Sequence, residues 1–182
     1  MTNATTTGAP IARPGSTEYI PYYDRYISQV PDGDLVETLR SQITDTLSLL
    51  RSIPEERAWH RYAPGKWSIK EVVGHLADVE RIMGYRALRI ARGDSTPMPG
   101  FDENAYVPAA NFEARSLASL AHELEQVRSA TIAFLETLEP VAAARRGTAN
   151  NAEISARALA YIIAGHERHH VAILRERYLS QS

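Results

Sequence analysis

The chain has 182 residues, of which 44% are hydrophobic and 23% are charged, as in an ordinary globular protein. Its formal net charge of −2 provides no positive patch of the kind that nucleic acid or an anionic membrane surface attracts. It has no cysteine, which excludes disulfides, thiolate metal ligands and a cysteine nucleophile. Any metal must therefore be held by His, Asp or Glu, and any thiol must arrive with a substrate or cofactor.

The first segment, residues 1–17, is rich in Thr, Ala, Gly and Pro and has no apolar period, which predicts a mobile N-terminal tail. It lacks the basic region and apolar core of a signal peptide, and no stretch of about 18 apolar residues follows that could span a membrane. We therefore expect a cytoplasmic protein with no membrane contact and a single domain over residues 18–182. The tyrosines of residues 19–26 are expected to pack against its body, although such a cluster can also line a ligand pocket.

Apolar residues recur at spacings of three and four in four segments, which predicts four long helices over residues 34–51, 68–93, 116–138 and 152–178. Asp34 is a suitable cap for the first helix. Ser68 and Glu71 form a capping-box pattern at the start of the second. Four amphipathic helices in one domain of this size favour an all-α fold, a four-helix bundle.

The connection between the second and third helices, residues 93–115, is unusually long and contains Pro97, Pro99, Gly100 and Pro108. It suits either a lid over a site or a long crossover connection, and the sequence leaves both open. No run of alternating β-branched residues occurs, so we expect a loop over residues 145–151 and no strands.

Three histidines share the buried stripes of their predicted helices. At about 100° per residue, His166 and His170 point into the middle of the apolar stripe of the fourth helix, and His169 lies at its edge. His75 lies on the inward arc of the second helix, whereas His122 points away from the stripe of the third. The prediction is a cluster of His75, His166 and His170 inside the bundle.

Burying three uncharged imidazoles together is costly unless a cation accepts their lone pairs. Three nitrogen ligands leave a position open, as in catalytic sites. Glu71, Asp78 and Glu167 are the carboxylates expected to orient the rings. The alternative is three separately satisfied core histidines. A di-iron site is disfavoured because, although residues 167–170 read Glu-x-x-His, Glu71 lies four residues before His75, which is the wrong spacing.

The segments that carry these histidines, residues 64–81 (PGKWSIKEVVGHLADVER) and 165–170 (GHERHH), resemble the DinB-like (damage-inducible) superfamily of metal-binding proteins. Residues 86–94 and 101–104 extend the resemblance. It implies a DinB/YfiT-like bundle with a crossover, often a homodimer, that holds nickel, zinc or a similar divalent metal ion through His75, His166 and His170. Relatives include S-transferases that use bacillithiol, mycothiol or glutathione, isomerases, and proteins named as hydrolases.

Three functions are compatible with this resemblance. The first is a metal-dependent thiol S-transferase, which joins a low-molecular-weight thiol to a small electrophilic substrate in detoxification or stress response. The second is a metal-dependent hydrolase, for which Glu167, Asp102 and Glu103 are the candidate general bases. The third is a non-catalytic metal- or ligand-binding bundle. Arg86 and Tyr106 are candidates for substrate contact, and a salt bridge is the alternative role of Arg86.

Overall fold

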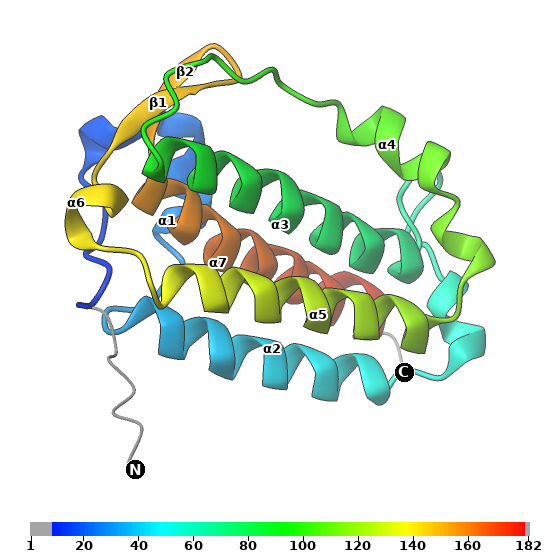
Figure 1. The fold of residues 1–182 in the computed structure, drawn as a ribbon. Helices are drawn as coiled ribbons and strands as arrows, with labels where there is room; N and C mark the ends of the chain where they lie inside the picture. The colour runs from blue at the N-terminus through cyan, green and yellow to red at the C-terminus, as the bar shows by residue number, and fades with distance from the viewer. Residues whose placement is uncertain (1–8, 181–182) are drawn as a thin grey trace.

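The computed structural model of the protein describes residues 9–180 and consists mainly of helices (Figure 1). Its four long helices are α2 (Leu35–Arg51), α3 (Ile69–Ala91), α5 (Leu117–Leu135) and α7 (Ala156–Ile173). Each begins after a capping side chain that accepts a backbone N–H: Asp34, Ser68, Ser116 and Ser155. The predicted all-α four-helix bundle is confirmed. None of the helices within residues 9–180 is long and apolar enough to cross a membrane.

The four helices form a square in which α3 packs against α5 and α7, and α2 packs against the same two helices. Helices α2 and α7 run in one direction and α3 and α5 in the other (Figure 1). The consecutive helices α3 and α5 are therefore parallel, so the chain between them must return along the whole bundle. The predicted long crossover connection is confirmed.

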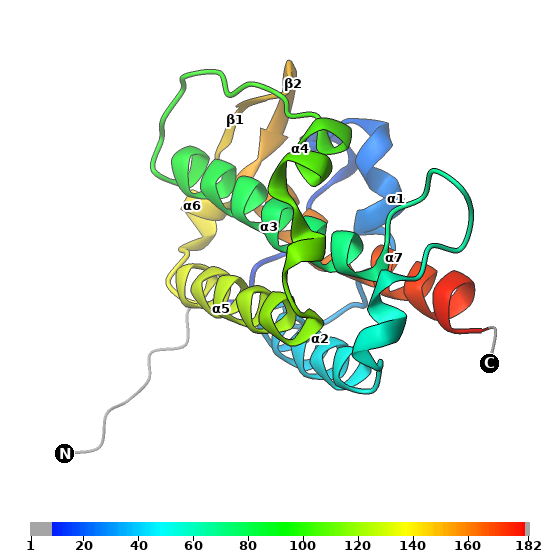
Figure 2. The same ribbon diagram turned by 90° about the vertical axis from the view of Figure 1, so that its right-hand side faces the viewer.

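The crossover is ordered over its length and contains α4 (Glu103–Ala110) and a 3₁₀ turn, Phe112–Ala114. Met98 anchors its first half, because its N–H donates to the Thr148 carbonyl at 2.9 Å and its carbonyl accepts from the Asn150 N–H at 3.0 Å. Helices α4 and α1 (Asp24–Ile27) both lie on the side of the bundle away from α2 and α5 (Figure 2).

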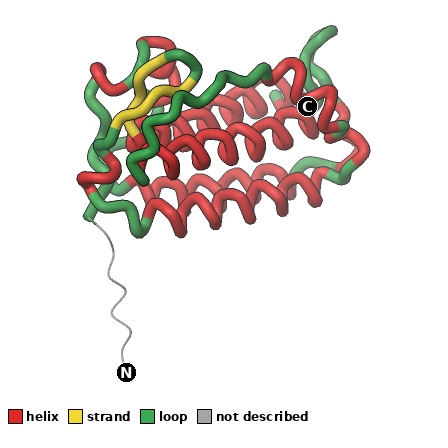
Figure 3. Tube along the Cα trace, turned by 45° about the horizontal axis from the view of Figure 1, so that its top comes forward, coloured by secondary structure: helices red, strands yellow, loops and turns green. Residues whose placement is uncertain are grey.

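A β-hairpin covers one end of the bundle, where the sequence pattern predicts a loop and the start of a helix (Figure 3). Its strands are β1 (Arg146–Ala149) and β2 (Ala152–Ser155), preceded by the short helix α6 (Pro140–Ala143). The turn residues Asn150 and Asn151 have φ of 51° and 59°, the left-handed conformation that a tight hairpin turn requires and asparagine tolerates. The strands are too short to show alternation, so the expectation was wrong.

The segment before α1 differs from the expected mobile tail. Ile11 is buried, and the Arg13 guanidinium donates to the carbonyls of Ile27 at 2.9 Å and Val30 at 2.6 Å. Arg157 pairs with Glu18 and holds the pKa of that carboxyl at about 2, below its usual range. Single contacts of this kind leave no period in the sequence. Residues 1–8 of the expected tail lie outside the described residues.

Gly165 allows α1 to lie directly on α7. A methyl group at Gly165 would overlap the backbone carbonyl of Tyr26, so only hydrogen permits this approach. The same contact brings the Tyr26 ring over α7, where its centroid lies 5.3 Å from that of His166.

A buried polar network joins all four long helices. The Arg128 guanidinium of α5 pairs with Glu80 of α3 at 2.8 Å and Glu167 of α7 at 2.8 Å, and it donates to the Leu39 carbonyl of α2 at 3.2 Å. Gln42 and Thr46 of α2 donate to the Glu167 carboxylate at 2.8 Å and 2.7 Å. Burial alone would lower the pKa of the Arg128 guanidinium, but the two carboxylates together raise it above its usual value, so the group is charged.

Removing the shared cation should destabilise the bundle strongly. Arg128→Met leaves the buried carboxylates of Glu80 and Glu167 without compensation and should cost about 3–5 kcal/mol in the free energy of unfolding. The measurement is urea unfolding. Arg40→Met is the matched control, because Arg40 pairs with Glu136 on the surface and its loss should cost less than about 1 kcal/mol. Equal costs for the two variants would contradict a structural role of the network.

Two glycines inside long helices should respond oppositely to alanine. Gly165→Ala should lower the melting temperature because α1 must move away from α7. Gly84→Ala should raise stability by about 0.5–1 kcal/mol, because alanine is the better helix former and the nearest atom to its methyl, Thr131 Oγ1, is 4.0 Å away. Thermal unfolding of the two variants checks this, and an unchanged melting temperature for Gly165→Ala would show that α1 does not depend on the close approach.

Candidate metal centre

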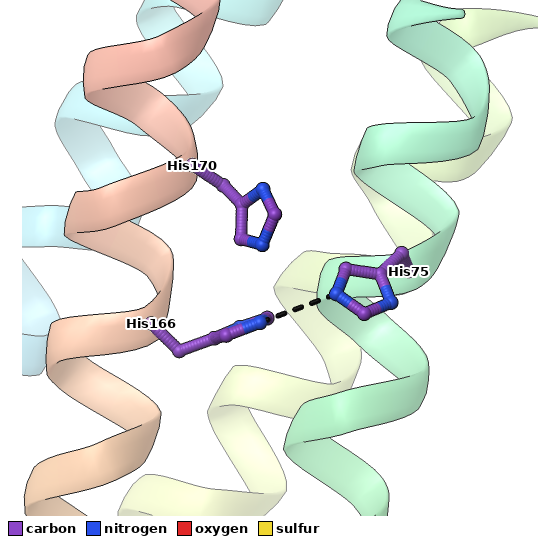
Figure 4. A group of neighbouring side chains, drawn as sticks. All are labelled: His75, His166 and His170. Atoms are coloured by element: carbon purple, nitrogen blue, oxygen red, sulfur yellow. Dashed lines mark hydrogen bonds between the residues drawn. The ribbon is translucent and has the colours of Figure 1, made fainter. Parts of the chain in front are cut away.

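The structure brings His75, His166 and His170 together inside the bundle, as predicted (Figure 4). His75 projects from α3, while His166 and His170 project from successive turns of α7. The Nε2 atoms of His75 and His166 lie 3.2 Å apart, and one potential ligand atom from each of the three rings lies within 4.8 Å of the others. Three ring nitrogens thus converge on one point between α3 and α7.

Burial keeps these imidazoles uncharged. It lowers the pKa of His75 to about 4 and, with help from the neighbouring His75 and His169, lowers the pKa of His170 to about 3. The pKa of His166 lies well below its usual value for the same reasons, burial first and the adjacent histidines second. At neutral pH each ring therefore keeps a lone pair available for a cation.

Aromatic rings pack against two of the three histidines, His75 and His166. The Trp67 ring centroid lies 4.7 Å from that of His75, and Tyr26 makes edge contacts with His166 at 5.3 Å and His169 at 5.5 Å. His169 is half-buried and outside the converging group, in agreement with its position at the edge of the apolar stripe. His122, predicted to be solvated, is exposed on α5 beside Glu125.

The histidines open into a cavity of about 450 Å³. Its wall comes from the turns around α1, from α3, from α7, from the crossover and from the hairpin turn. The lining is mostly aromatic and apolar, with one buried cation, Arg86, and one carboxylate, Glu103. Tyr22, Tyr23 and Tyr26, for which packing against the body was expected, form one side of it. Of the two roles left open for these tyrosines, the structure thus shows the pocket wall, because the close approach at Gly165 brings α1 onto α7.

Two of the candidate general bases are engaged elsewhere. Glu167 is buried on the side of α7 that faces α2 and α5, where it accepts from Gln42 and Thr46 and pairs with Arg128. Its carboxylate is therefore not presented to the histidines, neither as a base nor as a partner for their rings. Asp102 is exposed and caps α4 by accepting the Asn104 N–H at 2.9 Å. Of the three candidates, Glu103 is the one that lines the cavity.

The other two carboxylates expected to orient the rings have local roles. Glu71 accepts the Ser68 N–H of the predicted capping box and pairs with Arg61. Asp78 lies near Arg81 at 3.6 Å, and burial raises its pKa. The helical register alone could not show that arginines lie closer to both residues than the histidines do.

The two candidate substrate-contacting residues differ in position. Arg86 is buried and lines the cavity, as expected of a residue on the same face of α3 as His75. Tyr106 is exposed on α4, makes a tilted ring contact with Phe101 at 5.7 Å and lines a separate surface groove instead of the cavity. The direction of α4, which no pattern in the crossover encodes, turns Tyr106 outward.

The residues present fit a divalent cation. Three neutral imidazole nitrogens form a set that suits first-row ions such as zinc, nickel, iron or copper. His75, His166 and His170 are the residues that would hold the ion, and the cavity gives a ligand access to any remaining position. In residues 9–180 this is the one group of three or more His, Asp or Glu side chains with metal-ligand spacing.

Comparisons with known proteins show the family and the fold of this chain. The sequence profile of the DinB superfamily matches residues 38–174. A protein of Oceanobacillus iheyensis, provisionally named a metal-dependent hydrolase, is 26% identical over 143 residues, which cover 77% of this chain and 79% of that protein. The structure is similar to that of YfiT from Bacillus subtilis, described as a probable metal-dependent hydrolase with an unusual four-helix bundle topology. The TM-score is 0.68 at 17% identity, over 91% of this chain and 90% of YfiT. At that identity the likeness shows the fold alone.

The lowered pKa values predict the proton balance of metal binding. At pH 6, three histidines with the usual pKa near 6.5 would together carry about two protons, and a metal that binds the rings would release these protons. Here His75 and His170, with pKa values of about 4 and about 3, are already unprotonated. Calorimetric titration with zinc at pH 6, in buffers of different ionisation enthalpy, should therefore show release of almost no protons. Release of two or more protons would mean that the rings are solvated in the free protein.

Proposed function

This chain belongs to the DinB superfamily, and we propose that it is an enzyme that uses a divalent metal, zinc or nickel, to activate a nucleophile against a small-molecule substrate. The observation that supports this most is the convergence of three uncharged imidazoles at the wall of a 450 Å³ cavity. A purely structural metal site is normally closed by four protein ligands. A three-ligand site beside a cavity has room for a reacting group.

A divalent ion at these nitrogens would act as a Lewis acid that lowers the pKa of a coordinated thiol or water. The chain's own residues provide the surroundings of that reaction. Trp67 and Tyr26 cover the histidines and limit the access of bulk water, which strengthens electrostatic interactions within the cavity. The apolar wall formed by Val79, Met83 and Ile162 provides surface for the body of a substrate.

Thiol S-transfer is the reaction that we favour. A thiol loses its proton more easily than water does, so metal coordination alone can produce a thiolate without a protein base. The rings against the histidines are those of Trp67 and Tyr26, and two of the three candidate bases, Glu167 and Asp102, are engaged elsewhere. The low-molecular-weight thiol would be a co-substrate, because the chain has no cysteine of its own. A role in detoxification or stress response would follow from this chemistry.

Hydrolysis is the second candidate. Glu103 lines the cavity and is the carboxylate available there as a general base for an attacking water. The names of the Oceanobacillus iheyensis protein and of YfiT point to the same reaction class. If the metal-loaded protein catalyses neither reaction, the remaining function is that of a non-catalytic metal- or ligand-binding bundle.

The proposal also includes a cytoplasmic homodimer. An apolar groove of about 540 Å³ between α3 and α5, lined by Tyr85, Leu88 and Phe134, supports a second copy as its occupant. The groove lies on faces of α3 and α5 that carry none of the three histidines.

One assay series separates the reactions. Metal-loaded protein is given monochlorobimane with bacillithiol, mycothiol or glutathione, and separately a panel of esters and amides without thiol. We expect conjugation that depends on one thiol. Thiol-independent hydrolysis that Glu103→Gln lowers by a factor of about 10²–10⁴ would establish the second candidate instead.

The metal-site variants complete this test. His166→Ala should lose bound metal by elemental analysis and should lower kcat/KM at least about 100-fold, because a ligand and the Lewis acid are lost together. His122→Ala is the matched control, since this histidine is exposed on α5, and it should keep both metal and activity. Full metal content in His166→Ala would show that the three histidines are not the ligands.

A further inference from the structure

Arg86 differs from the other buried cations of the described chain in having no anionic partner. Lys70, Arg86 and Arg128 are 2%, 4% and 1% exposed. Lys70 pairs with Glu55 at 2.7 Å, and Arg128 pairs with Glu80 and Glu167. Within residues 9–180, no carboxylate lies within ion-pair distance of Arg86. The salt bridge considered in the sequence analysis is therefore absent from this part of the chain.

The groups in direct contact with the Arg86 guanidinium are neutral. Its guanidinium donates to the Pro99 carbonyl at 2.5 Å, lies 3.7 Å from Met83 Sδ and stands over the Phe101 ring at 5.6 Å. Burial lowers the pKa of the guanidinium, which nevertheless stays charged because arginine does not deprotonate in proteins. A buried charge without a counterion is costly. The guanidinium has five N–H donors, and the Pro99 carbonyl satisfies only part of them.

The position of Arg86 relative to the histidines indicates which end of a molecule bound in the cavity would carry an anionic group. Arg86 follows His75 by eleven residues on α3, which corresponds to a rise of about 16 Å along the helix axis. Helical side chains tilt toward the N-terminus of the helix, so the long Arg86 side chain extends back toward His75 and reduces the distance between the guanidinium and the imidazole. Val79 and Met83 lie between them on the same face and also line the cavity. A molecule in the cavity would therefore meet a cation at one end, an apolar wall along its length and the histidines at the other end.

We propose that Arg86 binds a carboxylate of the substrate or of its co-substrate, at the end of the cavity remote from the reacting group. A planar carboxylate matches the guanidinium fork. A phosphate dianion fits less well, because Arg86 is the one arginine or lysine among the cavity's lining residues and Glu103 adds a negative charge. The inference rests on the proposed function for the identity of the occupant, whereas anion binding itself requires no turnover.

The test compares two ligands that differ in charge, 4-cyclohexylbutanoate and 4-cyclohexylbutanamide. Both have an apolar body and absorb little where tryptophan does. Binding is followed by the fluorescence of Trp67, which lines the cavity, in a Trp59→Phe background that leaves one tryptophan. This readout matters because Arg86 also borders the surface groove beside Tyr106, where a ligand would lie away from Trp67.

The metal-loaded parent protein should bind the carboxylate at least about tenfold more tightly than the amide at pH 7.5, since charge-assisted hydrogen bonds exceed neutral ones in strength. Arg86→Gln, which keeps a donor for the Pro99 carbonyl, should reduce this ratio to near one, and Arg86→Lys should retain part of it. Arg89→Gln is the matched control: Arg89 pairs with Asp94 at the start of the same connection, outside the cavity, and its variant should keep the full ratio.

Three results would overturn the inference. The first is equal binding of the two ligands by the parent protein, and the second is a carboxylate preference that persists in Arg86→Gln. The third is a preference that disappears when chelation removes the metal from the parent, because the carboxylate would then sit on the metal. If circular dichroism shows that Arg86→Gln does not fold, the carboxylate preferences of Arg86→Lys and of the chelated parent still test the inference. A preference that depends on Arg86 in a protein without turnover would support the inference and contradict the proposed enzyme.

Discussion

The shared Arg128 guanidinium is the interaction on which the arrangement of the four helices depends. It meets carboxylates from α3 and α7 and a carbonyl from α2, so it links all four helices at one level. Buried charges of this kind tolerate few alternative packings, because any rotation of a helix would leave one of them unpaired. Glu167 follows His166 directly in α7. Holding the Glu167 carboxylate against α2 and α5 therefore turns His166 toward α3, where His75 lies.

Helices α3 and α7 thus carry two kinds of buried polar chemistry on different faces. One face has charges that compensate each other within the protein. The other has three uncharged imidazoles that satisfy one another only in part, through the contact of His75 with His166. The first arrangement is complete without a ligand, and the second has the donors that a cation needs. The stability of the bundle and the chemistry of the site are therefore separated in space, although adjacent residues of α7 contribute to both.

The cavity exists because of the connections and not because of the bundle. Parallel packing of α3 and α5 obliges the chain to return along the bundle, and this crossover carries Phe101 and Glu103 to the histidine side. The segment before α2 closes the opposite side with three tyrosines, which Gly165 admits by allowing α1 to approach α7. The resulting space is lined by one arginine, one carboxylate, and aromatic and imidazole rings.

The sequence by itself determined the four helices, the caps of two of them at Asp34 and Ser68, and the inward direction of His75, His166 and His170, because helical periodicity records which face of each helix is buried. Only the tertiary structure decided what each buried face meets. It placed Glu167 against Arg128 and not against an imidazole, left no carboxylate of residues 9–180 within ion-pair distance of Arg86, and formed the hairpin and the tyrosine wall. These features depend on contacts between residues far apart in the chain. A local period cannot encode such contacts, since it specifies the orientation of a side chain but not its partner.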